Sequence, residues 1–289
     1  MPVLLSGAPE SRHCRAAVER EDAIEYFYLP GKADAGMFRS EKQDSDLMPT
    51  GVAAILRAGD TIRDPEFDAI YTPDLRLRSG KHWTPVNVAI RAARLLTEIG
   101  STRVLDVGAG PGKFCIVGAL TTSAHFTGID KRDRLVEAAQ MAARRVGADT
   151  TAHFVCANVL DFGFRSFDGI YLYNPFHEQI AVDSMPIDET IQLSPDLYRA
   201  YVVCTVAKLA RAPAGTAVVT YHGFGGAMPS EYRRVHREDI GSDELVLWVK
   251  GRRQKRQPER RPLTSRLSIG RAGRMMGRIS KRRVWERHV

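Results

Sequence analysis

The stretch RVLDVGAGPGKFCIVGAL (103–120) decides the fold of this chain. Its first five residues form a short apolar run, which predicts a buried strand, whereas residues 113–120 have the apolar spacing of a helix. Gly108, Gly110 and Gly112 stand between the two. Glycine permits turns that other residues resist and lets a ligand approach the backbone closely. The stretch therefore predicts a strand, a tight turn and a helix, with a binding site over the turn.

Strand and helix signals alternate from residue 84 onward. Strands are predicted over 125–130, 151–162, 167–176 and 215–223, and helices over 84–100, 131–147 and 195–212. Thr84 can cap the first of these helices, and Gly100 can end it. The last segments, 231–238 and 243–251, are typical of a hairpin. The order predicts an α/β fold with three layers, in which a mostly parallel seven-stranded sheet ends in an antiparallel hairpin.

A sheet of this kind binds ligands at the carboxyl ends of its strands. The glycine turn, Asp130, CANVLD (156–161) and YNPF (173–176) each follow or end a predicted strand, so they should open on one rim. The turn does not match a P-loop, because Val107 and Phe114 replace the first glycine and the hydroxyl residue of that motif.

The turn also lacks the third glycine of the dinucleotide fingerprint, since Lys113 stands there. Asp106 adds a carboxylate to the turn, which suits a cationic ligand better than a pyrophosphate. A nucleotide-binding domain or a degenerate Rossmann-like domain is the alternative.

In VLDVGAGPGKF (104–114) and the acid at Asp130, the sequence resembles the class I S-adenosylmethionine-dependent methyltransferases, over roughly residues 80–250. The resemblance implies their Rossmann-like fold and S-adenosyl-L-methionine as cofactor. It implies that the glycine turn holds the methionine part, that Asp106 positions its amino group and that Asp130 takes the ribose hydroxyls. The cofactor-binding residues that it implies are Trp83, Thr84, Asp106, Gly108, Ala109, Gly110, Gly112, Asp130, Lys131, Asn158, Val159 and Asn174.

The segment YNPF resembles the [DNS]-P-P-[YFW] motif with which amine and amide methyltransferases hold a planar nitrogen, although it has one proline instead of two. The resemblance implies a nitrogen acceptor, and a catalytic set made of Asn174, Pro175, Phe176, His177 and Glu178. His177 or Glu178 could take the proton of an amine. The alternative is that the loop only shapes a pocket and that both side chains are solvated.

Thr84 and Pro85 also resemble a T-P segment of some adenine-N6 methyltransferases that closes over the cofactor. A helix cap explains both residues without a ligand. His82 and Trp83 beside them could form a wall of the pocket.

The four cysteines, Cys14, Cys115, Cys156 and Cys204, lie far apart without a C-x-x-C pair, so we predict free thiols, mostly in the core, and no metal site. The longest apolar runs are too short for a transmembrane segment, and the first residues lack the pattern of a signal peptide. A cytoplasmic location is therefore expected.

The positive charge of the chain is concentrated in residues 251–289, which hold 14 Lys+Arg and 2 Asp+Glu, a balance of +12. The other 250 residues carry 28 basic and 32 acidic residues, a balance of −4. This composition predicts a disordered basic tail, which is either an arm for nucleic acid or another anionic surface or a solvated extension. Residues 1–79 are expected to form an amino-terminal extension that caps the substrate mouth, with helices over 21–30 and 50–60 and loop over 64–80.

The sequence thus predicts methyl transfer from S-adenosylmethionine to an unknown acceptor. The acidic core and the single proline favour a nitrogen of a protein side chain or a small molecule, while the basic tail and the likeness to adenine methylases favour RNA or DNA. A regulatory module that keeps the cofactor site but transfers nothing is a further alternative. The oligomeric state is left open.

Overall fold

The computed structural model describes residues 48–181, 187 and 193–251. Cys14, the predicted helix over 21–30 and nearly all of the predicted basic tail lie outside the described residues.

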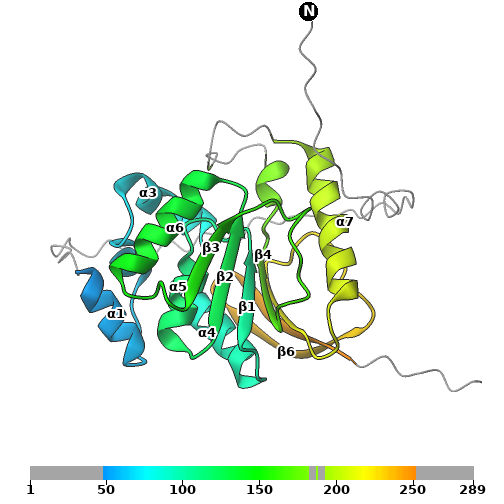
Figure 1. Ribbon diagram of the computed structural model, residues 1–289, viewed down its shortest axis with the longest axis horizontal. Coiled ribbons are helices and arrows are strands. Elements are labelled where there is room, and N and C mark those ends of the chain that lie inside the picture. Colours follow the sequence, from blue (N-terminus) through cyan, green and yellow to red (C-terminus); the bar gives the residue numbers. More distant parts are fainter. Residues whose placement is uncertain (1–47, 182–186, 188–192, 252–289) are drawn as a thin grey trace, which may run out of the picture. The chain divides into compact units, whose positions relative to one another are not determined.

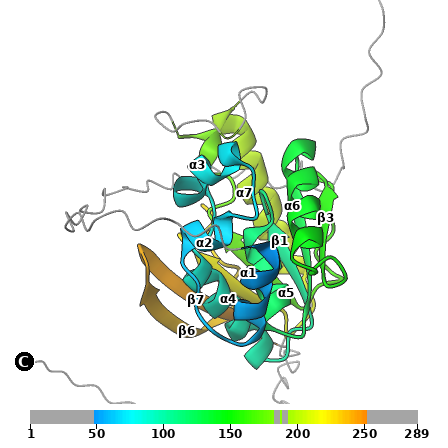
Figure 2. The same ribbon diagram turned by 90° about the vertical axis from the view of Figure 1, so that its left-hand side faces the viewer.

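A seven-stranded sheet forms the centre of the described domain, in the order β3-β2-β1-β4-β5-β7-β6. The parallel strands are β1 (Arg103–Val107), β2 (His125–Asp130), β3 (Ala152–Cys156), β4 (Gly169–Tyr173) and β5 (Ala217–Tyr221). The strands β6 (Tyr232–Ile240) and β7 (Asp243–Lys250) form an antiparallel hairpin at one edge (Figure 2), with β7 antiparallel to β5. The predicted sheet and its closing hairpin are confirmed.

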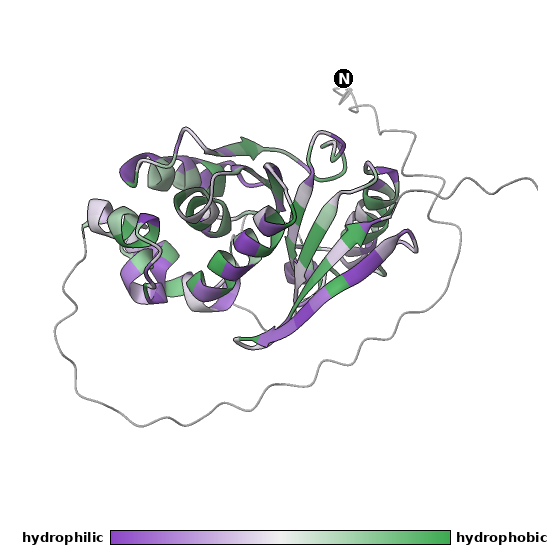
Figure 3. Ribbon diagram, turned by 90° about the horizontal axis from the view of Figure 1, so that it is seen from below, coloured by the Kyte–Doolittle hydropathy of each residue, from purple (hydrophilic) through white to green (hydrophobic). Residues whose placement is uncertain are grey.

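Apolar residues alternate between the two faces of the sheet and create two cores. On β1, Val104 packs with α4 (Val86–Glu98), α5 (Lys113–Thr121) and α6 (Asp133–Arg145), whereas Leu105 packs toward α7 (Pro195–Arg211). Figure 1 shows α7 on one side of the sheet and α5 and α6 toward the other. The outer strand β6 is mostly hydrophilic (Figure 3), as its exposed position requires. The three predicted layers are therefore present.

The described part of the amino-terminal extension packs into the same core as the domain. It forms α1 (Pro49–Arg57), α2 (Asp64–Asp68) and α3 (Pro73–His82), and the apolar side of α1 is buried with α5. The loop expected over 64–80 is wrong: α2 and α3 each have a proline at their start and an acidic first turn, which favour helix initiation. The expected boundary between residues 79 and 80 falls inside α3.

Thr84 does not cap α4, contrary to the prediction. Its hydroxyl lies 3.1 Å from the hydroxyl of Tyr171, in the core, and the helix begins at Val86. The backbone N–H of Val86 donates instead to Asp64 Oδ1 at 3.0 Å, so a carboxylate from α2 holds this helix end. The other end is as predicted, since Gly100 follows the helix with a φ of 95°.

Among the described residues, Cys115 and Cys204 are buried and Cys156 is exposed. In the same part of the chain, no cluster of three or more His, Cys, Asp or Glu side chains could hold a metal ion. None of the described helices is both long and apolar enough to cross a membrane.

Candidate cofactor and active site

The turn between β1 and α5 depends on glycine. Gly108, Gly110 and Gly112 have φ values of 76°, 55° and 82°, in the left-handed region that other residues avoid. A Cβ on Gly110 would lie 2.8 Å from the Trp83 ring. The N–H groups of Gly108 and Ala109 both donate to Ile129 O at 2.9 Å. These contacts fix the turn against the end of β2.

Asp130 ends β2 directly beside this turn. Its Oδ2 accepts the N–H of Gly110 at 3.1 Å, and its Oδ1 accepts the N–H of Arg132 at 2.9 Å. Burial raises the pKa of Asp130, while the Arg132 guanidinium, 3.6 Å from Oδ1, acts in the opposite direction. Because each carboxylate oxygen has two lone pairs, both can still accept a hydroxyl donor.

Asp106 is a buried carboxylate on the other side of the turn. Its side chain accepts from the Cys115 thiol, with 3.6 Å between Oδ2 and Sγ, and the residue is only 4% exposed. Burial raises the pKa of Asp106 to about 7. Within the described ranges, no basic side chain forms an ion pair with it. A cationic group on a ligand would therefore supply the missing charge.

Two cavities flank the turn, and both are lined by Val107 and Gly108. The first, of about 420 Å³ including its open mouth, lies beside Asp130. It brings together most residues predicted for the adenosine end, which are Asp130, Lys131, Asn158 and Val159, with Pro175, Phe176, Glu178 and Tyr201 from later segments.

The second cavity, of about 330 Å³, lies beside Asp106. Four residues predicted to bind the cofactor meet here, namely Trp83, Thr84, Asp106 and Ala109, with His82, Lys113, Phe114 and Tyr173. Thr84 thus lines the predicted pocket although it caps no helix. Both cavities are lined by residues at the carboxyl ends of parallel strands, and they share Val107 and Gly108.

The loop after β4 packs onto the glycine turn. Asn174 has a φ of 37°, and its N–H donates to Gly223 O at 2.9 Å. A Cβ on Gly108 would lie 3.0 Å from Pro175 Cβ. Phe176 is 5% exposed, and its ring centre lies 5.3 Å from that of Tyr201, in the cavity beside Asp130. These contacts give Pro175 and Phe176 a part in shaping the cofactor cavity.

The two predicted proton acceptors have different surroundings. Glu178 forms an ion pair with Arg132, and Oε1 accepts the N–H of Ile187 at 3.3 Å. The negative charge of Glu178 is therefore already balanced by Arg132. Burial lowers the pKa of His177, so this side chain is neutral near pH 7.

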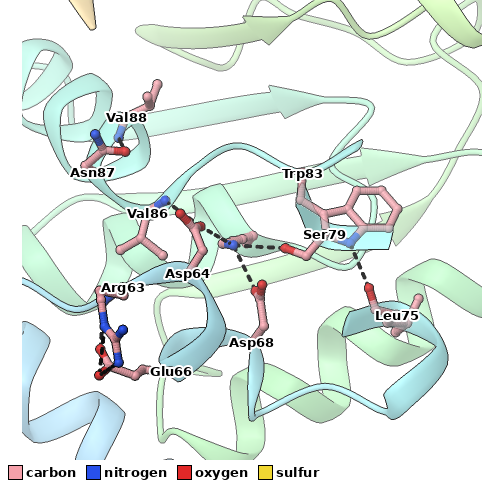
Figure 4. A network of polar contacts seen from close by, with 11 residues as sticks. Arg63, Asp64, Glu66, Asp68, Leu75, Ser79, Trp83, Val86, Asn87 and Val88 are labelled. Atoms are coloured by element: carbon pink, nitrogen blue, oxygen red, sulfur yellow. Dashed lines mark hydrogen bonds and ion pairs between the residues drawn. The ribbon is translucent and has the colours of Figure 1, made fainter. Parts of the chain in front are cut away.

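A buried lysine, which the sequence analysis did not select, connects the amino-terminal helices to the site. Lys113, the first residue of α5, places Nζ 2.5 Å from Asp64 Oδ1, 2.8 Å from Asp68 Oδ1 and 3.1 Å from Ser79 Oγ. In Figure 4 these three side chains converge on one ammonium group, next to Trp83. The cluster thereby joins α2 and α3 to the helix that follows the glycine turn.

A second missed group lies at the end of β5. His222 Nδ1 is 2.7 Å from Asp243 Oδ2, and Nε2 is 2.9 Å from Ser242 Oγ. No local pattern marks these residues, because only the pairing of β5 with β7 brings them together.

Comparisons with known proteins agree with this arrangement. Residues 104–189 match the family model described as "Methyltransferase domain". An O-methyltransferase of Aspergillus nomiae is 33% identical over 93 residues, 29% of this chain and 41% of that protein. A 24-methylenesterol C-methyltransferase of Oryza sativa subsp. japonica is 34% identical over 103 residues, 35% of this chain and 28% of that protein. The chain thus matches less than half the length of either relative.

Among solved structures, an RNA methyltransferase from Salinibacter ruber in complex with S-adenosyl-L-homocysteine is 20% identical, with a TM-score of 0.44, over 61% of this chain and 96% of that one. The family match covers the glycine turn, Asp130 and the loop after β4, which are the segments that build the two cavities. Residues 104–189 of this chain are therefore similar to methyltransferase domains.

Proposed function

We propose that this chain transfers a methyl group from S-adenosylmethionine to an acceptor that reaches the rim beside β4 and β5. The observation that carries the proposal is the pair of buried carboxylates on either side of the glycine turn. Asp106 has no basic partner among the described residues, and Asp130 has spare lone pairs. Asp130 would accept from the ribose hydroxyls, and Asp106 would balance the amino group of the methionine part. Asn158 and Val159 would contact adenine in the cavity beside Asp130.

The cofactor supplies an activated methyl group on a sulfonium, so the chain itself mainly has to orient and enclose the reactants. Trp83 is well placed for enclosure, since it covers Gly110 and is only 6% exposed. Pro175 covers Gly108 in the same way. The methyl group would then face the carboxyl ends of β4 and β5, where Tyr173 and His222 lie.

The chemical class of the methyl acceptor is a separate part of the proposal. A small molecule or a protein side chain fits best with the acidic balance of residues 1–250. The nitrogen acceptor predicted from YNPF needs an exposed aromatic platform, and the burial of Phe176 against Tyr201 gives it no support. The curated relatives act on oxygen and on carbon according to their names, which widens the set of acceptors to test.

Calorimetric titration with S-adenosylmethionine and S-adenosylhomocysteine tests the cofactor first. We expect micromolar binding to the wild type and no measurable binding to Asp130→Asn, because the amide nitrogen cannot accept a hydrogen bond from a ribose hydroxyl. The matched control is His153→Gln, on the exposed side of β3 away from both cavities. Absence of binding to the wild type at millimolar ligand would refute the proposal.

The non-catalytic module remains the competing function. A module of this kind would also bind S-adenosylmethionine, so calorimetry does not distinguish it from an enzyme. Incubation with S-adenosylmethionine labelled in the methyl group and a panel of acceptors does. Labelled product above the level of Asp130→Asn supports an enzyme.

A further inference from the structure

His222, Ser242 and Asp243 lie in contact at the carboxyl end of β5, through a hydrogen bond between His222 and Ser242 and an ion-pair contact between His222 and Asp243. His222 follows that strand directly, while Ser242 and Asp243 lie at the turn between β6 and β7. Nδ1 of His222 lies 2.7 Å from Asp243 Oδ2, and this neighbouring carboxylate favours the tautomer with the proton on Nδ1, because a carboxylate cannot donate. Nε2 is then left with a lone pair, which faces Ser242 Oγ at 2.9 Å. The group has the arrangement of a base oriented by an acid.

The imidazole lies next to the wall of the proposed methionine-side cavity. Its ring centre is 5.6 Å from that of Tyr173, which lines this cavity with Asp106. The hydrogen bond from Asn174 N to Gly223 O ties the loop after β5 to the loop after β4. The His222 side chain keeps 22% of its surface exposed, so a ligand from solvent can reach it.

The backbone at both loops is strained. Among the described residues, Asn174 and His222 are the two non-glycine residues with positive φ, at 37° and 53°. Such conformations are unfavourable for residues other than glycine and persist where the surroundings hold them, often at functional sites. At this backbone conformation the His222 side chain contacts Asp243 and Ser242.

We infer that His222, oriented by Asp243, is the general base of this domain and that the acceptor atom is the oxygen of a hydroxyl group. The inference rests on the proposed methyl transfer. The acceptor hydroxyl would take the place that the Ser242 hydroxyl now holds at Nε2. Its oxygen forms a bond to the methyl carbon as its proton passes to Nε2, and the carbon–sulfur bond breaks with its electron pair left on sulfur. The imidazolium, balanced by Asp243, then releases the proton to solvent.

A hydroxyl acceptor depends on such a base more than an amine does. A neutral amine attacks through a lone pair that it already has, whereas a hydroxyl becomes strongly nucleophilic only as its proton leaves. Burial lowers the pKa of His222, Asp243 opposes this effect and the nearby His177 adds to it. Tyr173 and Tyr221 are the other titratable side chains against the ring. Nε2 is therefore available at neutral pH.

The test measures transfer of tritiated methyl groups to catechol, p-cresol and benzyl alcohol, with benzylamine as the nitrogen probe. His222→Asn is the main variant, because asparagine tolerates the left-handed backbone. We expect transfer to at least one hydroxyl probe and a loss of about 100-fold or more in kcat/KM for this variant. His153→Gln should behave as wild type, and added imidazole should restore part of the activity of His222→Gly.

A readout without turnover is the tautomer of His222 in ¹⁵N-labelled protein. We expect the Nδ1–H form in the wild type and loss of this preference in Asp243→Asn. Calorimetry separates a failure of this inference from a failure of the proposed function. His222→Asn should bind S-adenosylmethionine as the wild type does. A wild type that does not bind contradicts the proposed function instead. An Nε2–H tautomer, unchanged kcat/KM in His222→Asn, or transfer by the wild type to none of the hydroxyl probes would overturn the inference.

Discussion

At the scale of single residues, we expect the carboxylate of Asp106 to strengthen cofactor binding and to reduce the stability of the fold. Its carboxyl is buried, and its pKa rises from the ordinary 3.8 to about 7. Between these two values the folded protein binds a proton that the unfolded chain has released, so the stability of the fold decreases as the pH rises from about 4 to 7. Above pH 7 the loss amounts to as much as about 4 kcal/mol, from 1.36 kcal/mol per pKa unit.

Asp106→Asn should therefore move stability and affinity in opposite directions. The amide carries no charge, so we expect the variant to be more stable than the wild type at pH 8, by up to about 4 kcal/mol, and to differ much less at pH 4. It should also bind S-adenosylmethionine more weakly, because the partner of the amino group is gone. Urea unfolding at both pH values and calorimetry at pH 7.5 measure the two effects. If the free energies of unfolding of the two proteins changed with pH in parallel, the ionisation of Asp106 would not reduce the stability of the fold.

At the scale of elements, the cluster around Lys113 holds the amino-terminal helices on the domain. Lys113 is 2% exposed and Asp68 is 5% exposed, so the pair is out of contact with water. Burial raises the pKa of Asp68, and the charge of Lys113 lowers it. Asp64 adds a second role, since it also accepts the N–H that begins α4. One ammonium group thus connects α2, α3, α4 and α5.

Lys113→Met should reduce the free energy of unfolding by about 3–5 kcal/mol, because it leaves a buried carboxylate without its partner. Urea denaturation measures the change. The control is Arg134→Met, which removes an exposed pair with Asp74 at 3.9 Å and should cost less than about 1 kcal/mol. Neutralising Asp64 and Asp68 to asparagine in the Lys113→Met background should recover part of the loss. A cost no larger than that of the control would rule out this role for the cluster.

The elements that sequence patterns predicted are those with a local signal. The strands are short apolar runs that end in glycine, acid or turn residues, and the glycine turn carries its own conformational requirement. By contrast, α2 consists of the five residues DPEFD and has no apolar period to detect. Thr84 and Tyr171 are 87 positions apart, and Lys113 and Asp68 are 45 apart, so their contacts depend on the finished fold. The His222 and Asp243 pair was missed for the same reason.

At the scale of the whole molecule, the distribution of charge divides the chain into two parts. Residues 251–289 carry +12 and the remainder −4. The described domain closes before the basic segment: β7 ends at Lys250, whose ammonium donates to Leu209 O, Ala210 O and Ala212 O, and the N–H of Gly251 donates to Glu231 O at 2.8 Å. Within the described residues, these contacts of Lys250 and Gly251 complete the sheet.

Deletion of residues 252–289 should leave the thermal stability and the affinity for S-adenosylmethionine unchanged while it abolishes binding to nucleic acid. Each phosphate contact made by a basic side chain releases a counterion, so log K for a single strand falls with log salt by about 0.7 per contact. Fluorescence anisotropy with a labelled single-stranded RNA at increasing salt measures this slope for the full and the shortened chain, and heparin as competitor tests whether any polyanion suffices. Equal RNA affinity of the two chains would assign the binding to the domain, and it would make the acidic balance of residues 1–250 a poor argument against a nucleic-acid acceptor.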